Sequence, residues 1–382
     1  MRSSLALFAA LAATAVLPVR AQAPWGVDPA PLLDVSSSAK SGAVLFTRVT
    51  GATRLSNGTI VIADLDDNTL HFFDATGKPL KDVGRAGGGP GEFRRLTWLG
   101  RCSGDSLHVW DMLQRRMAVF APNGTFVRQY FVPSDTAAKA NPFMTLACSP
   151  RGIIAFQAQP RMPKARPVVK DPMHPTRQDR VIRTTAMVSV ATTTGTITHE
   201  IGERSSGPIY AMGGGGFPLP LAPTTYVAVA GDRVFVGTSD STSTVEAYAA
   251  DGTPTTLKLD IPARRSTEGQ RSRAATAMAS LAPPQMRTLA EDSLKVSPMP
   301  ATLPPYSGLF GDSDGVLWVQ LTVPGDASTR LRAVDSAGRT LGEISLPADV
   351  TVQEIGHDYV IGSYDDKDDI PHFALFPLHR GR

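Results

Sequence analysis

Residues 55–80, LSNGTIVIADLDDNTLHFFDATGKPL, decide the fold because the chain repeats their pattern. Residues 102–127, CSGDSLHVWDMLQRRMAVFAPNGTFV, carry apolar residues at the same places, without a gap, at an offset of 47. The matching pairs are Ile60 and Leu107, Ile62 and Val109, Asp64 and Asp111, Leu70 and Met117, Phe73 and Phe120, and Gly77 and Gly124. Each unit holds four short strand-like stretches, and a fixed period of this kind is the signature of propeller blades.

Weaker copies of the unit follow along the chain. Residues 229–252 repeat the spacing with one extra residue, and residues 311–338 repeat it with a longer central hairpin. A third copy begins at residues 149–157 and resumes at 184–202 after a long insertion. We therefore predict an all-β, six-bladed β-propeller with four-stranded antiparallel blades, in a single domain over residues 22–382. The blades are expected to start near residues 44, 95, 142, 223, 304 and 350.

The sixth blade needs a strand from elsewhere in the chain. Strands are expected around residues 357–364 and 372–378, but the chain ends before a fourth strand. Residues 31–35, PLLDV, are the candidate that completes this sheet and closes the ring.

Residues 64–93, DLDDNTLHFFDATGKPLKDVGRAGGGPGEF, carry a family resemblance. They resemble the blade consensus of NHL-type repeats and, more closely, of the secreted bacterial six-bladed β-propeller proteins, in which a GPGEF-like segment links one blade to the next. The resemblance is specific over residues 53–131, is weaker over 223–262 and 304–346, and is poor over 142–201. Members of that group mostly lack a defined activity, so the resemblance implies a fold more than a function.

The glycine-rich stretch VGRAGGGPGEF, residues 83–93, has two interpretations. A phosphate-binding loop would need a G-x-G-x-x-G register opening a helix, or Gly-Lys-Ser/Thr after the spacer, and neither occurs. An extended segment follows instead. We therefore interpret the stretch as the connection from one blade to the next, with Phe93 filling the gap between the blades.

The N-terminus has the pattern of a secretory signal peptide. Arg2 precedes an apolar run over residues 5–17 that is too short to span a bilayer. Val19 and Ala21 fit the cleavage rule, so residues 1–21 are the predicted signal peptide of a secreted or periplasmic protein. The mature chain has 36 basic and 35 acidic residues. This balance gives no support to a nucleic-acid partner. We also expect no transmembrane segment and a monomer.

The two cysteines, Cys102 and Cys148, would meet an oxidising compartment in an exported protein. They lie 46 residues apart, close to the repeat length of 47, which puts them at the lower ends of neighbouring inner strands. A disulfide is therefore permitted, provided that the neighbouring strands come close enough to bridge.

Four long irregular segments are expected on one face, because all return to the same end of the blades: 84–95, 158–184, 202–222 and 263–303. Residues 266–296 of the last segment predict two short helices, separated at Pro283-Pro284, between blades 4 and 5. These helices could cap a pocket, although filling space at a crossover is the interpretation that we favour.

The insertion at residues 158–184 carries seven basic and two acidic side chains, among them Arg161, Lys164 and Arg166. One interpretation is a clamp for an anionic ligand. The other, which we favour, is a solvated loop, because no aromatic platform is interleaved with the charges.

The predicted channel mouth is formed by the first residues of the inner strands: Arg48, Arg95, Asn141, Tyr226, Tyr306 and Asp349. A Ca²⁺ ion needs 6–8 oxygen ligands, and these residues supply one amide and one carboxylate, so calcium has little support there and no cofactor is expected. The histidines, including His71, His174, His357 and His372, show no metal-binding spacing and are interpreted as surface or edge residues. Asp64 and Asp111 are interpreted as hairpin caps, since their positions repeat.

Two classes of function fit these features. The first is a binding protein that recognises a protein, a carbohydrate or another anionic ligand on the loop-rich face. The second is a propeller hydrolase or lyase, of lactonase type, with its site at the channel mouth. No pair of residues in the sequence has the pattern of an acid–base pair, which favours binding.

Overall fold

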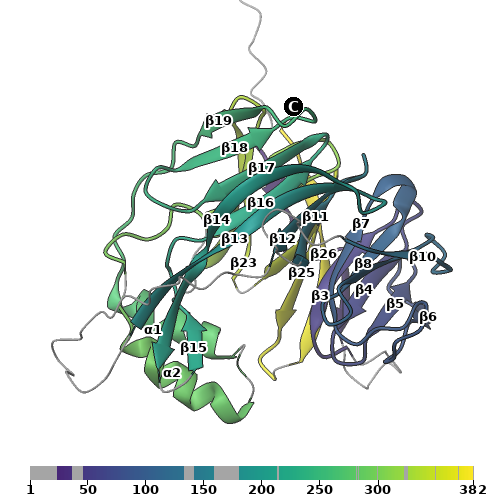
Figure 1. The fold of residues 1–382 in the computed structure, drawn as a ribbon, viewed down its shortest axis with the longest axis horizontal. Helices are drawn as coiled ribbons and strands as arrows, with labels where there is room; N and C mark the ends of the chain where they lie inside the picture. The colour runs from purple at the N-terminus through teal and green to yellow at the C-terminus, as the bar shows by residue number, and fades with distance from the viewer. Residues whose placement is uncertain are drawn as a thin grey trace, which may run out of the picture.

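The structure is a computed structural model that describes residues 24–36, 46–132, 142–158, 180–212, 215–280, 282, 284–298, 300–321, 326–348, 350–368 and 370–381. Six antiparallel sheets succeed one another around a common centre (Figure 1). The inner strand of each sheet contacts the inner strands of both neighbours, in the order β3, β7, β11, β16, β20, β24 and back to β3. The chain is therefore a six-bladed β-propeller with a closed ring, as the repeat predicts.

The first two blades have the regular meander of the repeat. Blade 1 consists of β3 (Val49–Arg54), β4 (Ile60–Asp64), β5 (Thr69–Phe73) and β6 (Pro79–Val83). Blade 2 consists of β7 (Leu96–Arg101), β8 (Leu107–Asp111), β9 (Arg116–Phe120) and β10 (Phe126–Phe131), with a 3-10 turn at Ser103–Asp105. The two middle strands of each blade are buried on both faces, which explains their continuous apolar runs.

Blade 3 differs most from the prediction. It consists of β11 (Pro142–Cys148), β12 (Ile153–Ala158), β13 (Arg180–Thr192), β14 (Ile197–Met212) and β15 (Gly215–Pro218). Most of the 202–222 segment, expected to be irregular, is the extended end of β14 followed by β15. The long β13–β14 ribbon reaches past the other blades toward the helices (Figure 1).

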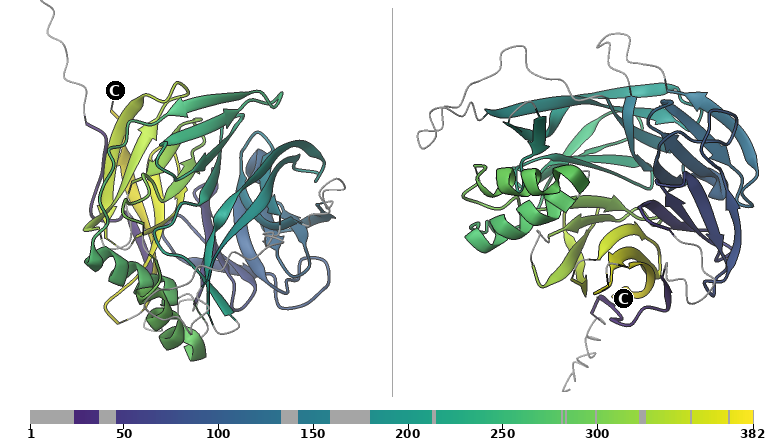
Figure 2. Two further views of the ribbon diagram at one scale, coloured as in Figure 1. Left: turned by 60° about the vertical axis from the view of Figure 1, so that its left-hand side comes forward. Right: turned by 90° about the horizontal axis from the view of Figure 1, so that it is seen from below.

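Blades 4 and 5 return to four strands each. Blade 4 consists of β16 (Thr225–Ala230), β17 (Arg233–Thr238), β18 (Thr244–Tyr248) and β19 (Pro254–Lys258). Blade 5 consists of β20 (Gly308–Gly311), β21 (Leu317–Gln320), β22 (Ser328–Val334) and β23 (Thr340–Pro347). Between them, α1 (Glu268–Ser280), a 3-10 turn (Pro284–Met286) and α2 (Arg287–Lys295) form the predicted helical insertion. The two helices pack side by side at one end of the molecule (Figure 2).

Blade 6 joins the two ends of the chain. Its strands are β24 (Thr351–Ile355), β25 (Tyr359–Asp365), β26 (Pro371–His379), β1 (Gly26–Val27) and β2 (Leu33–Ser36). Both N-terminal strands pair with β26, with Leu33 opposite Leu375 and Gly26 opposite His379. The predicted closing strand is therefore confirmed, and a second, shorter strand extends it.

The hydrophobic core is divided among the blade junctions. Six buried clusters each combine residues of two neighbouring blades. They contain Phe93 between blades 1 and 2, Trp110 between blades 2 and 3, Val234 between blades 3 and 4, Phe235 between blades 4 and 5, Trp318 between blades 5 and 6, and Phe373 between blades 6 and 1. Each blade thus buries its two faces against its neighbours, so that ring closure completes the core.

The glycine-rich crossover is a structural connection. The ring of Phe93 is fully buried, 6.0 Å from that of Phe120 in blade 2. The carboxylate of Glu92 accepts a hydrogen bond from the Gly89 amide at 2.8 Å, and the buried Arg116 donates to the carbonyls of Gly89 and Glu92. The loop is therefore held by its own Glu92 and by Arg116 of β9, which fix it against blade 2.

A disulfide joins Cys102 and Cys148 at the lower ends of β7 and β11. Their Cα atoms lie 5.7 Å apart, inside the range that a bridge requires. The bond links blade 2 to blade 3 across their inner strands.

Candidate functional site

A pocket of about 1060 Å³ opens on the face where the inner strands begin, which we call the top face. Three parts of the chain enclose it: the crossover from blade 3 to blade 4, helix α1, and the upper ends of blades 4 to 6. The apolar lining residues include Pro208, Pro218, Leu219, Leu221, Ala277, Met278, Phe310, Val350 and Val352. Helix α1 therefore forms one wall of a pocket, whereas a space-filling role was favoured from sequence.

Hydroxyl groups make up much of the remaining lining. They come from Ser206, Thr224, Tyr226, Ser272, Thr276, Ser280, Ser307, Thr329 and Thr351, with the amide of Gln320 in addition. Hydroxyls and amides both donate and accept hydrogen bonds without carrying charge. The pocket is thus amphipathic, and its polar groups are mostly neutral.

Tyr226 is held at the pocket by the first residues of β16. Its ring lies 6.1 Å from that of Tyr306, and the Tyr306 hydroxyl donates to the carbonyl of Thr244 at 3.1 Å. Burial raises the pKa of Tyr226 to about 12, so its phenol is neutral at physiological pH. No described residue accepts a hydrogen bond from this hydroxyl, which leaves it available to a ligand.

The charged groups at the pocket are few. Asp326 accepts a hydrogen bond from Arg264 at 3.0 Å, and the same guanidinium donates to the Leu321 carbonyl at 2.9 Å. Arg273 of α1 is exposed at the rim. Among the described lining residues, Asp326 is the single carboxylate, and its partner Arg264 already neutralises it.

The predicted channel-mouth residues have different environments. Tyr226 lines the pocket, whereas Tyr306 is fully buried behind it and supports the Tyr226 ring. Arg48 is exposed and pairs with Asp66 at 3.2 Å on blade 1, and Arg95 is exposed at the start of blade 2. The remaining predicted residues, Asn141, Asp349, Arg161, Lys164 and Arg166, lie outside the described residues.

A polar network that sequence reasoning missed lies lower in the channel. Glu354 of β24 accepts hydrogen bonds from the hydroxyls of Thr53 and Tyr359. Arg101 of β7 approaches the same carboxylate at 4.0 Å and Asp105 at 3.4 Å. These side chains lock blades 6, 1 and 2 together beside a cavity of about 150 Å³, which is small for an organic ligand.

Asp64 and Asp111 have the same role in blades 1 and 2. The Asp64 carboxylate accepts from the amides of Arg48 at 3.3 Å and Asp66 at 2.9 Å. The Asp111 carboxylate accepts from the amides of Arg94 at 2.7 Å and Gln114 at 2.9 Å. Each carboxylate thus caps the hairpin that follows it and fixes the start of the inner strand, as their repetition predicts.

Comparisons with known proteins show similarity in fold. No protein-family model matches the sequence, and no curated protein matches it. A solved structure of a DUF4221 family member from Bacteroides vulgatus is 11% identical over 94% of this chain and 99% of its own, with a TM-score of 0.49. Virginiamycin B lyase from Staphylococcus aureus is 12% identical over 91% and 98%, with a TM-score of 0.42.

The calcium-binding protein regucalcin from Agrobacterium tumefaciens is also similar, 10% identical over 94% of this chain and 96% of its own, with a TM-score of 0.40. At these identities the likeness concerns the fold and carries no argument about a ligand or a reaction. In the part of the chain that the structure describes, no helix is long and apolar enough to cross a membrane.

Proposed function

We propose that this protein is a binding propeller that holds a neutral oligosaccharide in the top-face pocket. The observation that carries the proposal is the pocket itself, whose volume of about 1060 Å³ is at the upper end of the range for small-molecule sites. Its lining alternates neutral hydroxyls with apolar surface, and sugars present the same combination of hydroxyls and C–H faces. Tyr226 and Phe310 supply aromatic rings against which such a C–H face packs.

Charge favours a neutral ligand over an anionic one. The basic clamp considered from sequence belongs to residues 158–184, most of which lie outside the described residues, and the pocket lining does not include a cluster of cations among its described residues. Arg273 alone would offer little electrostatic binding to a polyanion, because it is exposed at the rim.

The lining also favours binding over hydrolysis. A hydrolase of acid–base type needs a titratable pair within reach of the substrate. Among the described lining residues, the carboxylate of Asp326 is ion-paired with Arg264, and no histidine stands beside it. The polar groups that remain are suited to hold a ligand rather than to transfer its protons.

Export is part of the proposal. The signal peptide predicted at residues 1–21 lies outside the described residues, so the argument for a secreted or periplasmic protein rests on the sequence and on the disulfide. Relationship to NHL-type repeats likewise stays a prediction from the blade sequences.

The test is a binding screen of the mature protein against neutral oligosaccharides, followed by calorimetric titration. We expect Tyr226→Ala to weaken binding at least tenfold, because it removes a ring and a free donor from the pocket wall. Arg48→Ala is the matched control, since Arg48 lies at the start of another inner strand but outside the described pocket lining. A loss of affinity in Arg48→Ala with none in Tyr226→Ala would place the ligand elsewhere and refute the proposal.

A further inference from the structure

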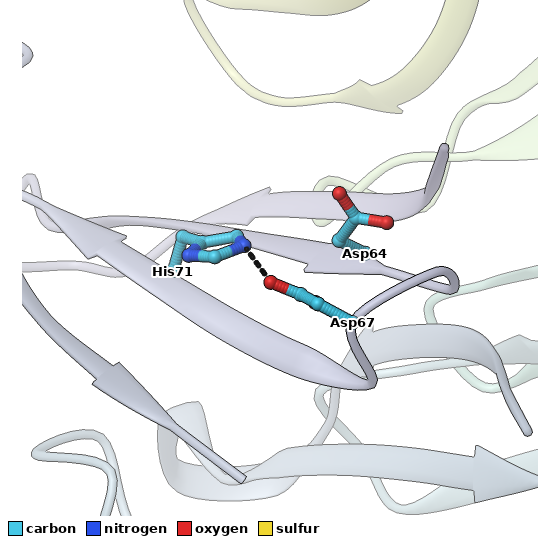
Figure 3. A group of neighbouring side chains, drawn as sticks. All are labelled: Asp64, Asp67 and His71. Atoms are coloured by element: carbon cyan, nitrogen blue, oxygen red, sulfur yellow. Dashed lines mark ion pairs between the residues drawn. The ribbon is translucent and has the colours of Figure 1, made fainter. Parts of the chain in front are cut away.

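A second group of polar side chains lies in blade 1, apart from the top-face pocket. Asp64 ends β4, Asp67 lies in the hairpin that follows, and His71 lies in β5 (Figure 3). The ligand atoms of the three side chains all lie within 4.8 Å of one another. The sequence interpretation of His71 as a surface or edge residue is wrong, because its side chain is 2% exposed.

The two nitrogens of the His71 ring have different environments. Nδ1 lies 2.9 Å from Oδ1 of Asp82, on the neighbouring strand β6, and makes a hydrogen bond with it. Nε2 is buried and makes no hydrogen bond. It lies 3.2 Å from Oδ2 of Asp67, and Figure 3 shows the ring edge turned toward that carboxylate.

This arrangement suits a ring that carries its proton on Nδ1 and donates it to Asp82. When Nδ1 carries the proton that it donates to Asp82, Nε2 presents a lone pair to Asp67, and two acceptors then face each other. A bound cation removes the conflict. A histidine that binds a metal ordinarily donates its other ring N–H to a carboxylate, and Asp82 takes that place here.

The distances suit a first-row ion. Zinc binds histidine nitrogen and carboxylate oxygen at about 2.0–2.2 Å, so tetrahedral geometry separates two such ligand atoms by about 3.3–3.5 Å. The Nε2-to-Oδ2 distance of 3.2 Å is close to that value. Asp64 lies further off, where backbone amides hold its carboxylate, so it would contact the ion through a bridging water.

The negative charge around His71 also favours a bound cation. Asp64, Asp67 and Asp82 surround a single imidazole, and the carboxylate of Asp64 is held in place by backbone amides. The ligand oxygens of Asp64 and Asp67 lie within 4.8 Å of each other, a separation at which two negative charges repel. A divalent cation would offset this repulsion.

We propose that Asp64, Asp67 and His71 form a binding site for a divalent transition-metal ion, best fitted to Zn²⁺, with Asp82 orienting the imidazole. The mixed nitrogen and oxygen donors favour zinc over Mg²⁺ and Ca²⁺, which prefer oxygen ligands alone. His71 and Asp67 would bind the ion directly and Asp64 through water, which leaves the rest of the coordination to water. The side chain of Asp67 is 45% exposed, so the site is open to solvent.

Blade 6 supplies a natural comparison. Nδ1 of His372 lies 2.7 Å from Asp34 and Nε2 lies 3.4 Å from Asp366, which resembles the surroundings of His71. Among the described residues, no third ligand group lies as close to His372 as Asp64 does to His71. His372 therefore only bridges the carboxylates of Asp34 and Asp366. The rival explanation for His71 is the same role without a metal, as a partner of Asp67 and Asp82.

The experiment titrates the metal-free mature protein with ZnCl₂ by calorimetry, with MgCl₂ and CaCl₂ in parallel. We expect one zinc ion per chain. Asp67→Asn should weaken zinc binding at least tenfold by removing an exposed ligand, and Asp82→Asn should weaken it about 10–100-fold by removing the outer partner of His71. Asp366→Asn, the matched change in blade 6, should leave the zinc affinity unchanged.

Two results would overturn the site. One is the absence of stoichiometric zinc binding by the folded wild-type protein, which would leave His71 as a metal-free partner of its two carboxylates, like His372 in blade 6. The other is zinc binding that Asp67→Asn leaves intact, or that Asp366→Asn weakens equally, which would place the ion elsewhere. Circular dichroism of each variant shows whether the fold is retained, and because Asp67 and Asp82 are both substantially exposed, both variants are expected to fold.

Discussion

Replacement of Arg380 by methionine tests whether an ion pair between the C-terminal residues and blade 5 holds the ring closed. Arg380 follows β26 and reaches blade 5, where Nη2 lies 2.7 Å from Oδ2 of the fully buried Asp312. The same guanidinium donates to the carbonyls of Gly356 and His357. It also lies over the rings of Trp25 and Trp318, 5.6 and 5.7 Å from their centres. One side chain thus ties the C-terminus, the N-terminus and two blades together.

The stability lost in Arg380→Met follows from the buried carboxylate that the substitution leaves without its positively charged partner. Methionine keeps most of the apolar contact with the tryptophans but removes the positive charge, so Asp312 stays buried without its cation. Removing one partner of a buried ion pair costs about 3–5 kcal/mol. Asp312 would still accept from the indole of Trp318 at 2.8 Å and the amide of Val316 at 2.8 Å, so we expect the lower end, about 3 kcal/mol.

Urea unfolding followed by tryptophan fluorescence measures this loss, because Trp25 and Trp318 report on the closure itself. Asp312→Asn and the double variant complete a thermodynamic cycle, in which the double variant should lose less than the sum of the two single variants. A loss below about 1 kcal/mol in Arg380→Met, or strict additivity in the cycle, would show that the ion pair does not hold the ring closed.

Three further predictions concern stability. The Cys102–Cys148 bridge closes a 46-residue separation, so Cys102→Ala/Cys148→Ala should lose about 4 kcal/mol by chain entropy in urea unfolding, and a loss below about 1 kcal/mol would contradict the bridge. Burial lowers the pKa of His108 from 6.5 to about 4, so only the unfolded chain gains a proton just below pH 6.5. The free energy of unfolding should therefore fall by about 3 kcal/mol between pH 6.5 and 4. His108→Gln should make the free energy of unfolding depend less steeply on pH in this range, and an unchanged pH dependence would argue against a neutral buried ring. A Cβ at Gly311 would lie 1.9 Å from the Val229 carbonyl oxygen, so Gly311→Ala should cost at least about 1–3 kcal/mol, and an unchanged melting temperature would mean that β16 and β20 are not in contact there.

Much of the ring could be predicted from sequence because the blade signals are local. The offset between residues 55–80 and 102–127 aligns strands and turns directly, and the closing strand follows from a sheet that is one strand short. Phe93 could be placed between blades because a single aromatic ends a glycine-rich crossover. Each inference needs only neighbouring residues and the repeat.

Blade 3 was mispredicted for a physical reason. Residues 202–222 were expected to be irregular, yet Gly202 and Gly207 lie inside β14 with φ of 110° and 88°. The register of the β13–β14 ribbon shifts near both positions, so these glycines allow bulges in a continuous strand. Sequence cannot distinguish a bulge of this kind from a turn without the pairing partner.

The pocket was beyond sequence because distant segments create it. Asp64, Asp67 and His71 lie in one hairpin, but their spacing matches no metal-binding motif, so the cluster was missed as well. Tyr226 could be placed at the start of an inner strand, but its neighbours from α1 and blade 6 lie far along the chain. Asp82 meets His71 only because β5 and β6 pair in that register. Neither contact leaves a local spacing signal.

Hydrogen exchange of the mature protein, with and without an oligosaccharide that binds it, would locate the ligand. We predict added protection in residues 206–208, 218–226 and 272–280, with smaller changes at 304–310 and 350–352, since these segments enclose the top-face pocket. Protection confined to the lower channel at residues 98–101 and 353–355, or an α1 helix unaffected by a saturating ligand, would contradict the proposed binding function.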